Sequence, residues 1–168
     1  MRKKKVIADP LVVGEEVHTT HGEVVIVLST FYKNNRKFAW VEFQDETKYV
    51  TSVVCGNILN GVLHNPYRRS VCGVGYFGEG VHLSSGGLYD NVYTTWRMIL
   101  RRAYEPAQKT RKIYKVCTAW HNYQVFAEWY IANRPPKGIR TYFIFDGLGE
   151  NTYLYSPDTC YLSDTLVK

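Results

Sequence analysis

Arginine and lysine side chains that could neutralise phosphates are concentrated in one stretch of the chain. Arg97, Arg101 and Arg102 have helical spacing, so we expect them to project from the exposed side of one helix. Such cations displace the counterions of a phosphate backbone, and arginine can also bind a guanine edge. A helix face that is merely solvated is the alternative explanation. The candidate nucleic-acid-binding residues are Arg68, Arg69, Arg97, Arg101, Arg102, Lys109, Arg111, Lys112 and Lys115.

The charge distribution supports this interpretation. The chain has 168 residues and a net charge of +6, and residues 67–115 hold 9 Lys+Arg against 3 Asp+Glu. Residues 1–66 and 116–168 are close to balance, so the excess lies in the middle segment, where a concentrated field would attract polyanions. The 45% hydrophobic and 21% charged content is that of a globular protein and excludes disorder, collagen and coiled coil.

Other motifs carry weaker signals for chemistry. Gly73-Val74-Gly75-Tyr76-Phe77-Gly78 matches the dinucleotide-binding pattern G-x-G-x-x-G, but no βαβ pattern surrounds it, so we expect a flexible connector. His18 and His21 could supply two imidazoles to a metal, yet further ligands are not evident. The 4 cysteines are scattered, which favours free thiols in a reducing cytosol.

The first third of the chain has the pattern of short strands separated by turns. A small antiparallel β-barrel of the SH3-like kind over residues 1–66 is the expected domain. Its predicted strands are Val17–Thr20, Glu23–Thr30, Lys37–Phe43 and Lys48–Val53.

The rest of the chain has mixed helix and strand patterns. Residues 67–92 form the Gly-rich connector, and residues 93–168 form an α+β domain. Helical periodicity begins at about Tyr93, and a second helix is predicted over residues 122–132. The C-terminal part is predicted to form a ββα unit. Its two strands are Arg140–Phe145 and Thr152–Tyr155, joined by a hairpin-type loop, and its helix is predicted to start at Ser156-Pro157-Asp158.

A family resemblance rests on matched aromatic spacings. The matching runs are Trp96-x-x-Ile99-Leu100-x-Arg102-x-Tyr104, Val116-x-x-x-Trp120-x-Asn122-Tyr123-x-x-Phe126-x-x-Trp129, Asn65-Pro66, Gly73-Val74-Gly75-Tyr76 and Tyr155-Ser156-Pro157-x-x-Cys160. With these runs the chain resembles phage-encoded homing endonucleases of the HNH type that carry an AP2-like DNA-binding region. The resemblance covers nearly the whole chain, because the β-rich N-terminal piece is similar to one in many phage members.

The resemblance implies DNA binding by the middle segment and a metal-dependent ββα nuclease unit at the C-terminus. HNH chemistry needs a histidine that activates water and side chains that hold a divalent metal. No histidine follows His121, which lies outside the ββα unit, and residues 140–145 are apolar where relatives are acidic. The remaining weak candidates are Asp146 and Asn151 for catalysis and Asp146, Glu150 and Asp158 for a metal, which would be Mg²⁺ if nuclease activity survives.

The sequence thus favours a phage-type protein that binds double-stranded DNA, derived from an HNH homing endonuclease that is catalytically impaired. One alternative is an active Mg²⁺-dependent endonuclease. Another is a phage effector with an anti-defence or host-takeover role that binds and inhibits a host protein, with Tyr142, Tyr153 and Tyr161 as an aromatic anchor. No run of about 18 apolar residues occurs, so we expect no membrane partner and a place in the cytoplasm of an infected bacterial host.

Overall fold

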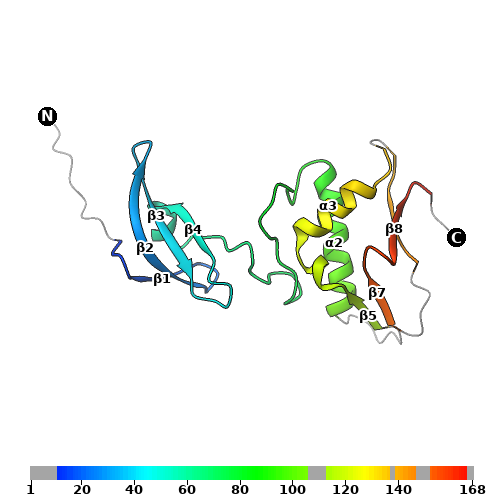
Figure 1. The fold of residues 1–168 in the computed structure, drawn as a ribbon, viewed down its shortest axis with the longest axis horizontal. Helices are drawn as coiled ribbons and strands as arrows, with labels where there is room; N and C mark the ends of the chain where they lie inside the picture. The colour runs from blue at the N-terminus through cyan, green and yellow to red at the C-terminus, as the bar shows by residue number, and fades with distance from the viewer. Residues whose placement is uncertain (1–10, 106–112, 137–138, 147–151, 166–168) are drawn as a thin grey trace. The chain divides into compact units, whose positions relative to one another are not determined.

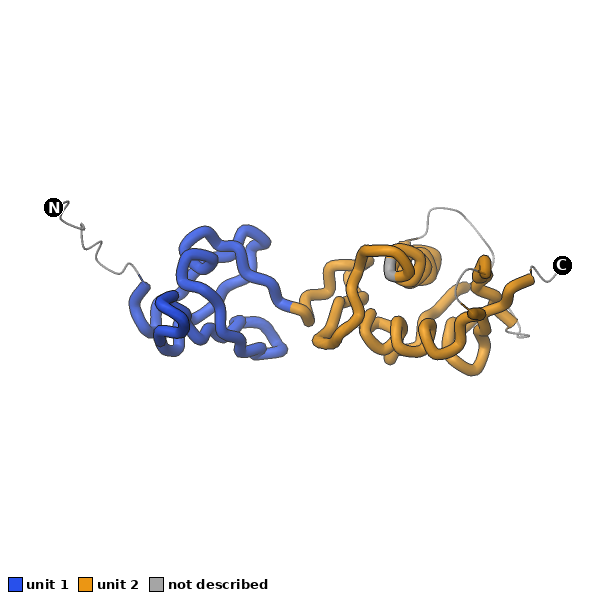
Figure 2. Tube along the Cα trace, turned by 90° about the horizontal axis from the view of Figure 1, so that it is seen from above, with its two compact units in different colours: residues 1–65 blue, residues 66–168 orange. Residues whose placement is uncertain are grey.

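The chain folds into two compact units, each with its own hydrophobic core (Figure 2). The computed structural model describes residues 11–105, 113–136, 139–146 and 152–165 (Figure 1). Unit 1 comprises residues 1–65 and unit 2 comprises residues 66–168. The mixed α+β class expected from the sequence is confirmed. No helix among the described residues is both long enough and apolar enough to cross a membrane.

Unit 1 is built on a four-stranded antiparallel sheet in the order β1-β2-β3-β4. Its elements are β1 (Glu16–His18), β2 (Val24–Lys33), β3 (Arg36–Phe43), β4 (Val50–Val54) and the short helix α1 (Cys55–Leu59). The four strands expected from alternating β-branched and aromatic residues are therefore confirmed. The described strands form an open sheet, because β4 pairs only with β3, and a closed barrel is not formed. The SH3-like likeness stays a prediction.

One face of this sheet forms the core of unit 1. Val25 and Val27 of β2 and Ala39 and Val41 of β3 are fully buried on that face, and Ile58 of α1 packs on them. Alternate residues of a strand point to opposite faces, so the residues between these positions face away from the core. The opposite face of the sheet therefore does not contribute to this core.

Unit 2 is organised around two helices, α2 (Leu88–Tyr104) and α3 (Tyr123–Asn133), as the 3.6-residue periodicity predicted. Helix α2 begins five residues before the expected start, after Gly87, and the Asp90 carboxylate accepts a hydrogen bond from the Gly86 N–H at 3.0 Å. Trp96 is buried between the helices and donates its indole N–H to the Trp120 carbonyl at 2.7 Å. Trp120 belongs to the 3₁₀ helix η1 (Thr118–His121), which precedes α3.

The Gly-rich segment that was expected to be a flexible connector packs against the core of unit 2. A Cβ atom on Gly75 would lie 2.5 Å from Leu100 Cδ1, and one on Gly78 would overlap the Asn122 side chain. These glycines therefore permit close packing. The segment runs on to α2 only at Leu88, so the G-x-G-x-x-G run does not meet a helix N-terminus, and the dinucleotide pattern is not realised.

The C-terminal strands pair differently from the expected ββα unit. The strands are β5 (Ile113–Val116), β6 (Tyr142–Phe145), β7 (Thr152–Tyr155) and β8 (Cys160–Ser163). Strand β6 pairs antiparallel with β8, and β7 pairs in parallel with β5, so the predicted β6–β7 hairpin is wrong.

The helix predicted from Ser156-Pro157-Asp158 is also wrong, because the chain makes a tight turn there and enters β8. The Ser156 N–H donates to the Thr159 hydroxyl at 3.1 Å, which closes the turn. Serine, proline and aspartate are common both in helix starts and in turns, so local sequence does not separate the two. Burial of Cys160, opposite Phe145 in the β6–β8 pair, favours the strand.

Candidate nucleic-acid interface

Helix α2 presents its arginines to solvent on two different sides. Arg97 and Arg101 are one helical turn apart and both are exposed. Arg102 follows Arg101 directly, and successive residues of an α-helix are rotated by about 100°. The three arginines expected to share one face therefore form a pair and a separate single residue.

Arg97 and Arg101 border a hollow on the surface of unit 2 with a volume of about 340 Å³. The Arg97 guanidinium lies 5.8 Å from the centre of the Tyr93 ring, which steadies it over the aromatic face. The segment before the Gly-rich turn supplies the opposite wall. The hollow is lined by Ser70, Val71, Cys72, Tyr93, Arg97, Arg101 and Glu105.

One carboxylate, Glu105, lies against this arginine pair. The Arg101 Nε donates a hydrogen bond to Glu105 Oε2 at 2.9 Å, and this bond is the largest cause of the lowered pKa of Glu105. The Cys72 thiol contacts the other carboxylate oxygen, with Sγ 3.3 Å from Oε1. Counted over the ionised side chains, the lining of the hollow carries two positive charges and one negative charge.

The Cys72 thiol is held in its protonated form. Burial is the largest cause that raises its pKa to about 11, and the hydrogen bond to Glu105 adds to the effect. A thiol with this pKa holds almost no thiolate at neutral pH, so it is a poor nucleophile. Cys72 therefore contributes the wall of the hollow and a hydrogen bond to Glu105.

Arg102 lies on the other side of α2, against β5. Its Nη2 donates to the Tyr114 hydroxyl at 2.9 Å, and its guanidinium lies 4.3 Å from the centre of that ring. The Tyr114 ring in turn stacks on Tyr153 and Tyr155 of β7, at 5.2 Å and 5.7 Å between ring centres. An exposed arginine stacked on an aromatic row keeps a defined direction, which suits contact with a phosphate.

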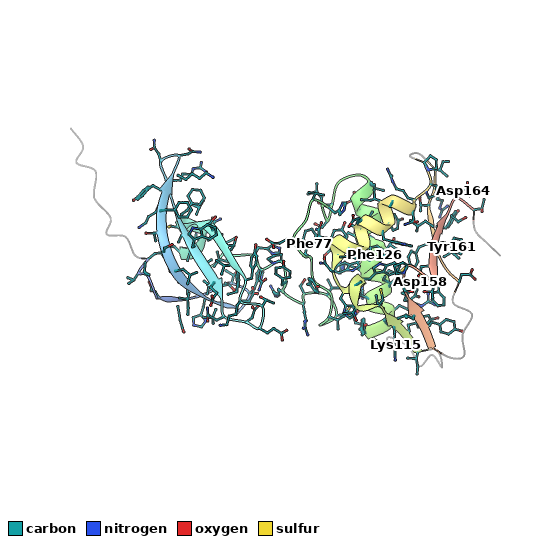
Figure 3. The ribbon with its side chains drawn as sticks, in the orientation of Figure 1. Phe77, Lys115, Phe126, Asp158, Tyr161 and Asp164 are labelled. Carbon is teal, nitrogen blue, oxygen red and sulfur yellow. The ribbon has the colours of Figure 1, made fainter. Side chains whose placement is uncertain are left out.

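The remaining basic candidates are placed in part. Arg69 is exposed, and its charge lowers the pKa of His121, although burial is the larger cause. Arg68 is half-buried in the same segment. Figure 3 labels Lys115 on β5, where it is exposed. Lys109, Arg111 and Lys112 lie outside the described residues.

His121 is packed into unit 2 and has a protein partner. Its Nε2 lies 2.9 Å from the Tyr104 hydroxyl, and the ring meets the Tyr104 ring edge-on. Burial is the largest cause that lowers the pKa of His121, and a lowered pKa favours the neutral imidazole. The contact with Tyr104 fixes the position of the His121 ring in the packing of unit 2.

Two of the four candidate nuclease residues lie in the described part of unit 2. Asp146 and Asp158 are both exposed, with Asp158 at the turn between β7 and β8 (Figure 3), while Glu150 and Asn151 lie outside the described residues. Next to Asp146, the Phe145 ring packs on the Tyr153 and Tyr155 rings at 5.3 Å and 5.1 Å. Among the described residues, no three His, Cys, Asp or Glu side chains are grouped as metal ligands.

Sequence reasoning missed the residues that complete the hollow. Glu105 stands four residues after Arg101, and that spacing alone predicts a helical ion pair. Ser70 and Cys72 come from a segment about thirty residues earlier in the chain, and no periodicity links them to α2. Comparisons with protein-family models, with curated proteins and with solved structures found no match. The HNH-type resemblance therefore stays a prediction.

Proposed function

We propose that the chain binds double-stranded DNA through unit 2 and that Arg97 and Arg101 contact phosphates of its backbone. The observation that carries this proposal is the hollow of about 340 Å³ that these two arginines line on α2. Guanidinium groups bind phosphate oxygens through paired, charge-assisted hydrogen bonds. The hydroxyl of Ser70, which also lines the hollow, can donate a further hydrogen bond to a phosphate oxygen.

The charge around the hollow supports a polymeric anion more than a single small one. Exposed Arg69 and Arg102 belong to the same unit, and Lys115 adds a positive charge from β5. Binding of several phosphates releases several counterions, and this release drives association with DNA at moderate salt. Glu105 offsets part of the charge, so we propose that it moderates the affinity.

The proposal covers binding and leaves out cleavage. The buried aromatic frame of Trp96, Trp120 and Phe126 is compatible with descent from an HNH-type homing endonuclease of a phage, which we retain as a proposal. The strand pairing of β6 and β7 departs from a ββα nuclease unit. Phage origin would place the protein in the cytoplasm of an infected bacterium.

A salt titration with paired charge variants tests the proposal. The double variant Arg97→Gln/Arg101→Gln and the control Arg140→Gln are titrated into a labelled DNA duplex at several salt concentrations. Arg140 is exposed, and its guanidinium lies 5.0 Å from the centre of the Tyr142 ring. Arg140→Gln therefore removes a positive charge from another part of unit 2. We expect the double variant to bind more weakly and with a flatter salt dependence than the control.

Two outcomes would contradict the proposal. One is the absence of duplex binding by the unmodified chain even at low salt. The other is an equal loss of affinity per charge in the double variant and in Arg140→Gln, which would indicate diffuse attraction without a site at the hollow.

A further inference from the structure

The outward face of the unit 1 sheet carries a group of aromatic side chains that the core does not use. Phe31 of β2 and Phe38 and Trp40 of β3 project from the face opposite the buried Ala39 and Val41. Trp40 is 43% exposed. Phe31 and Phe38 are half-buried. A cluster of aromatic rings that reaches the surface of a sheet is a recurrent sign of an interaction site.

The rings are arranged as a platform. Phe31 and Phe38 are cross-strand partners, and their rings are 5.5 Å apart at an interplanar angle of 17°. Phe31 and Trp40 lie 6.1 Å apart at 31°. Phe31 is therefore stacked on Phe38 and tilted against Trp40, and the three rings form one cluster across β2 and β3 against which a planar group can lie.

The backbone of the hairpin explains why the platform faces solvent. The register between β2 and β3 shifts between Val27 and Ser29, so the strand changes its pairing just after the last buried valine. Beyond this bulge the hairpin extends to the turn at Asn34 and Asn35, whose φ angles of 49° and 57° fit a tight two-residue turn. The turn brings Lys33 and Arg36 opposite each other at its base.

The rim of the platform is positively charged. The rings border a hollow of about 720 Å³, which is within the size range of ligand-binding clefts. Both charged side chains among its described lining residues, Lys33 and Arg36, are basic. The lining residues are Phe31, Lys33, Asn34, Arg36, Phe38, Trp40 and Ser52.

We infer that this face of unit 1 binds single-stranded nucleic acid, with unpaired bases stacked on Trp40, Phe38 and Phe31 and phosphates held by Lys33 and Arg36. Aromatic platforms beside cationic groups are the common means by which proteins hold unpaired bases, because every base has a face that can stack. A proline-rich peptide can also dock on aromatic grooves, but it gains nothing from a basic rim. A polyanion does gain attraction from the basic rim, so the charge of the rim favours single-stranded nucleic acid over a proline-rich peptide.

This binding surface belongs to unit 1 and does not depend on the duplex-binding proposal for unit 2. The two proposals make separable predictions, because base stacking needs unpaired bases and backbone neutralisation does not. Variants of Arg97 and Arg101 should leave capture of single strands by unit 1 in place. Variants of the platform should leave the contribution of unit 2 to duplex binding in place.

The experiment uses the full chain and measures binding of fluorescein-labelled oligo(dT), oligo(U) and a duplex of equal length. Trp40→Leu removes the exposed indole and keeps an apolar side chain, so unit 1 should still fold. The matched control is Tyr32→Ala, because Tyr32 is 75% exposed and lies one position from Phe31 on the other face of the same hairpin. Lys33→Gln/Arg36→Gln tests the rim.

We expect Trp40→Leu to weaken binding of oligo(dT) or oligo(U) by about fivefold to 160-fold, the range for loss of one stacking contact. Tyr32→Ala should bind as the unmodified chain does. The rim variant should flatten the salt dependence for single strands by a slope of about 1.4, since each cation contributes about 0.7. The preference between the two oligonucleotides then identifies the natural strand as DNA or RNA.

The tryptophan signal provides a second readout. Trp96 and Trp120 are fully buried and Trp129 is half-buried, so Trp40 is the most exposed of the four tryptophans. Quenching of fluorescence by unlabelled oligo(dT) or oligo(U) should therefore be reduced in Trp40→Leu. The inference is overturned if neither oligonucleotide binds a chain that carries Arg97→Gln/Arg101→Gln, or if Tyr32→Ala weakens binding as much as Trp40→Leu. It is also overturned if a proline-rich peptide binds the platform and the oligonucleotides do not.

Discussion

Replacement of Glu105 by glutamine should strengthen binding of duplex DNA. Glu105 accepts a hydrogen bond from Arg101 at 2.9 Å and so offsets one of the two arginine charges at the hollow. Glutamine keeps the size of the side chain and a carbonyl acceptor but removes the negative charge. Arg101 would then meet a phosphate without competition from a carboxylate.

The magnitude follows from the number of charges that face the DNA. Each phosphate neutralised by a cation adds about 0.9 to the slope of log affinity against log salt. Release of Arg101 from Glu105 should therefore steepen the slope by up to about 0.9. Between about 200 mM and 50 mM salt, this difference makes the variant gain about 3.5-fold more affinity than the unmodified chain gains.

Fluorescence anisotropy with a labelled duplex over this range of salt provides the measurement. Glu128→Gln is the matched control, because Glu128 is an exposed acidic residue on α3 of the same unit. This substitution also removes one negative charge. The reasoning is refuted if Glu105→Gln and Glu128→Gln shift the slope and the affinity equally. A loss of affinity in Glu105→Gln would also refute it, because the ion pair would then be needed to orient Arg101.

Three further outcomes are expected. Alkylation of Cys72 by iodoacetamide should be slow at pH 8 and should rise with pH up to about 11, because a pKa of about 11 keeps the thiol protonated. Glu105→Gln should speed this alkylation at pH 8, because loss of the carboxylate lowers the pKa of the thiol. Peptide mass spectrometry follows the reaction of this thiol, and equal rates in both proteins would contradict the contact between Cys72 and Glu105. Gly75→Ala should lower the free energy of unfolding by about 1–3 kcal/mol in urea denaturation, because its Cβ would press on Leu100; an unchanged midpoint would show that the neighbouring side chain yields freely. Asn122→Ala should lower the free energy of unfolding by about 0.5–2 kcal/mol in the same assay, because the Asn122 side chain caps α3 by accepting a hydrogen bond from the Gln124 N–H at 2.9 Å. Asn122→Asp should retain most of the stability.

Local sequence patterns predicted most of the secondary structure. The alternation in β2 and β3 and the periodicity of α2 and α3 correspond to elements that the structure contains. These patterns act over a few residues, because they express which side of a strand or helix is apolar. The concentration of positive charge in residues 67–115 is likewise a property of the sequence.

Strand pairing at the C-terminus required contacts between distant segments. Local sequence favoured a β6–β7 hairpin, but β7 pairs with β5, about forty residues earlier, and β6 pairs with β8. Aromatic packing supports this arrangement, since Tyr114 of β5 stacks on Tyr153 and Tyr155 of β7. A pattern confined to one strand cannot show which neighbour will bury its rings best.

Both proposed binding surfaces also arise from tertiary contacts. Arg97 and Arg101 could be placed on a helix from their spacing, but the approach of Ser70 and Cys72 makes the hollow. Likewise, the sequence contains Phe31, Phe38 and Trp40, yet the pairing of β2 with β3 after the bulge sets their rings side by side. Residue types and local spacing supply the charges and the rings, whereas long-range packing sets which of them share a surface.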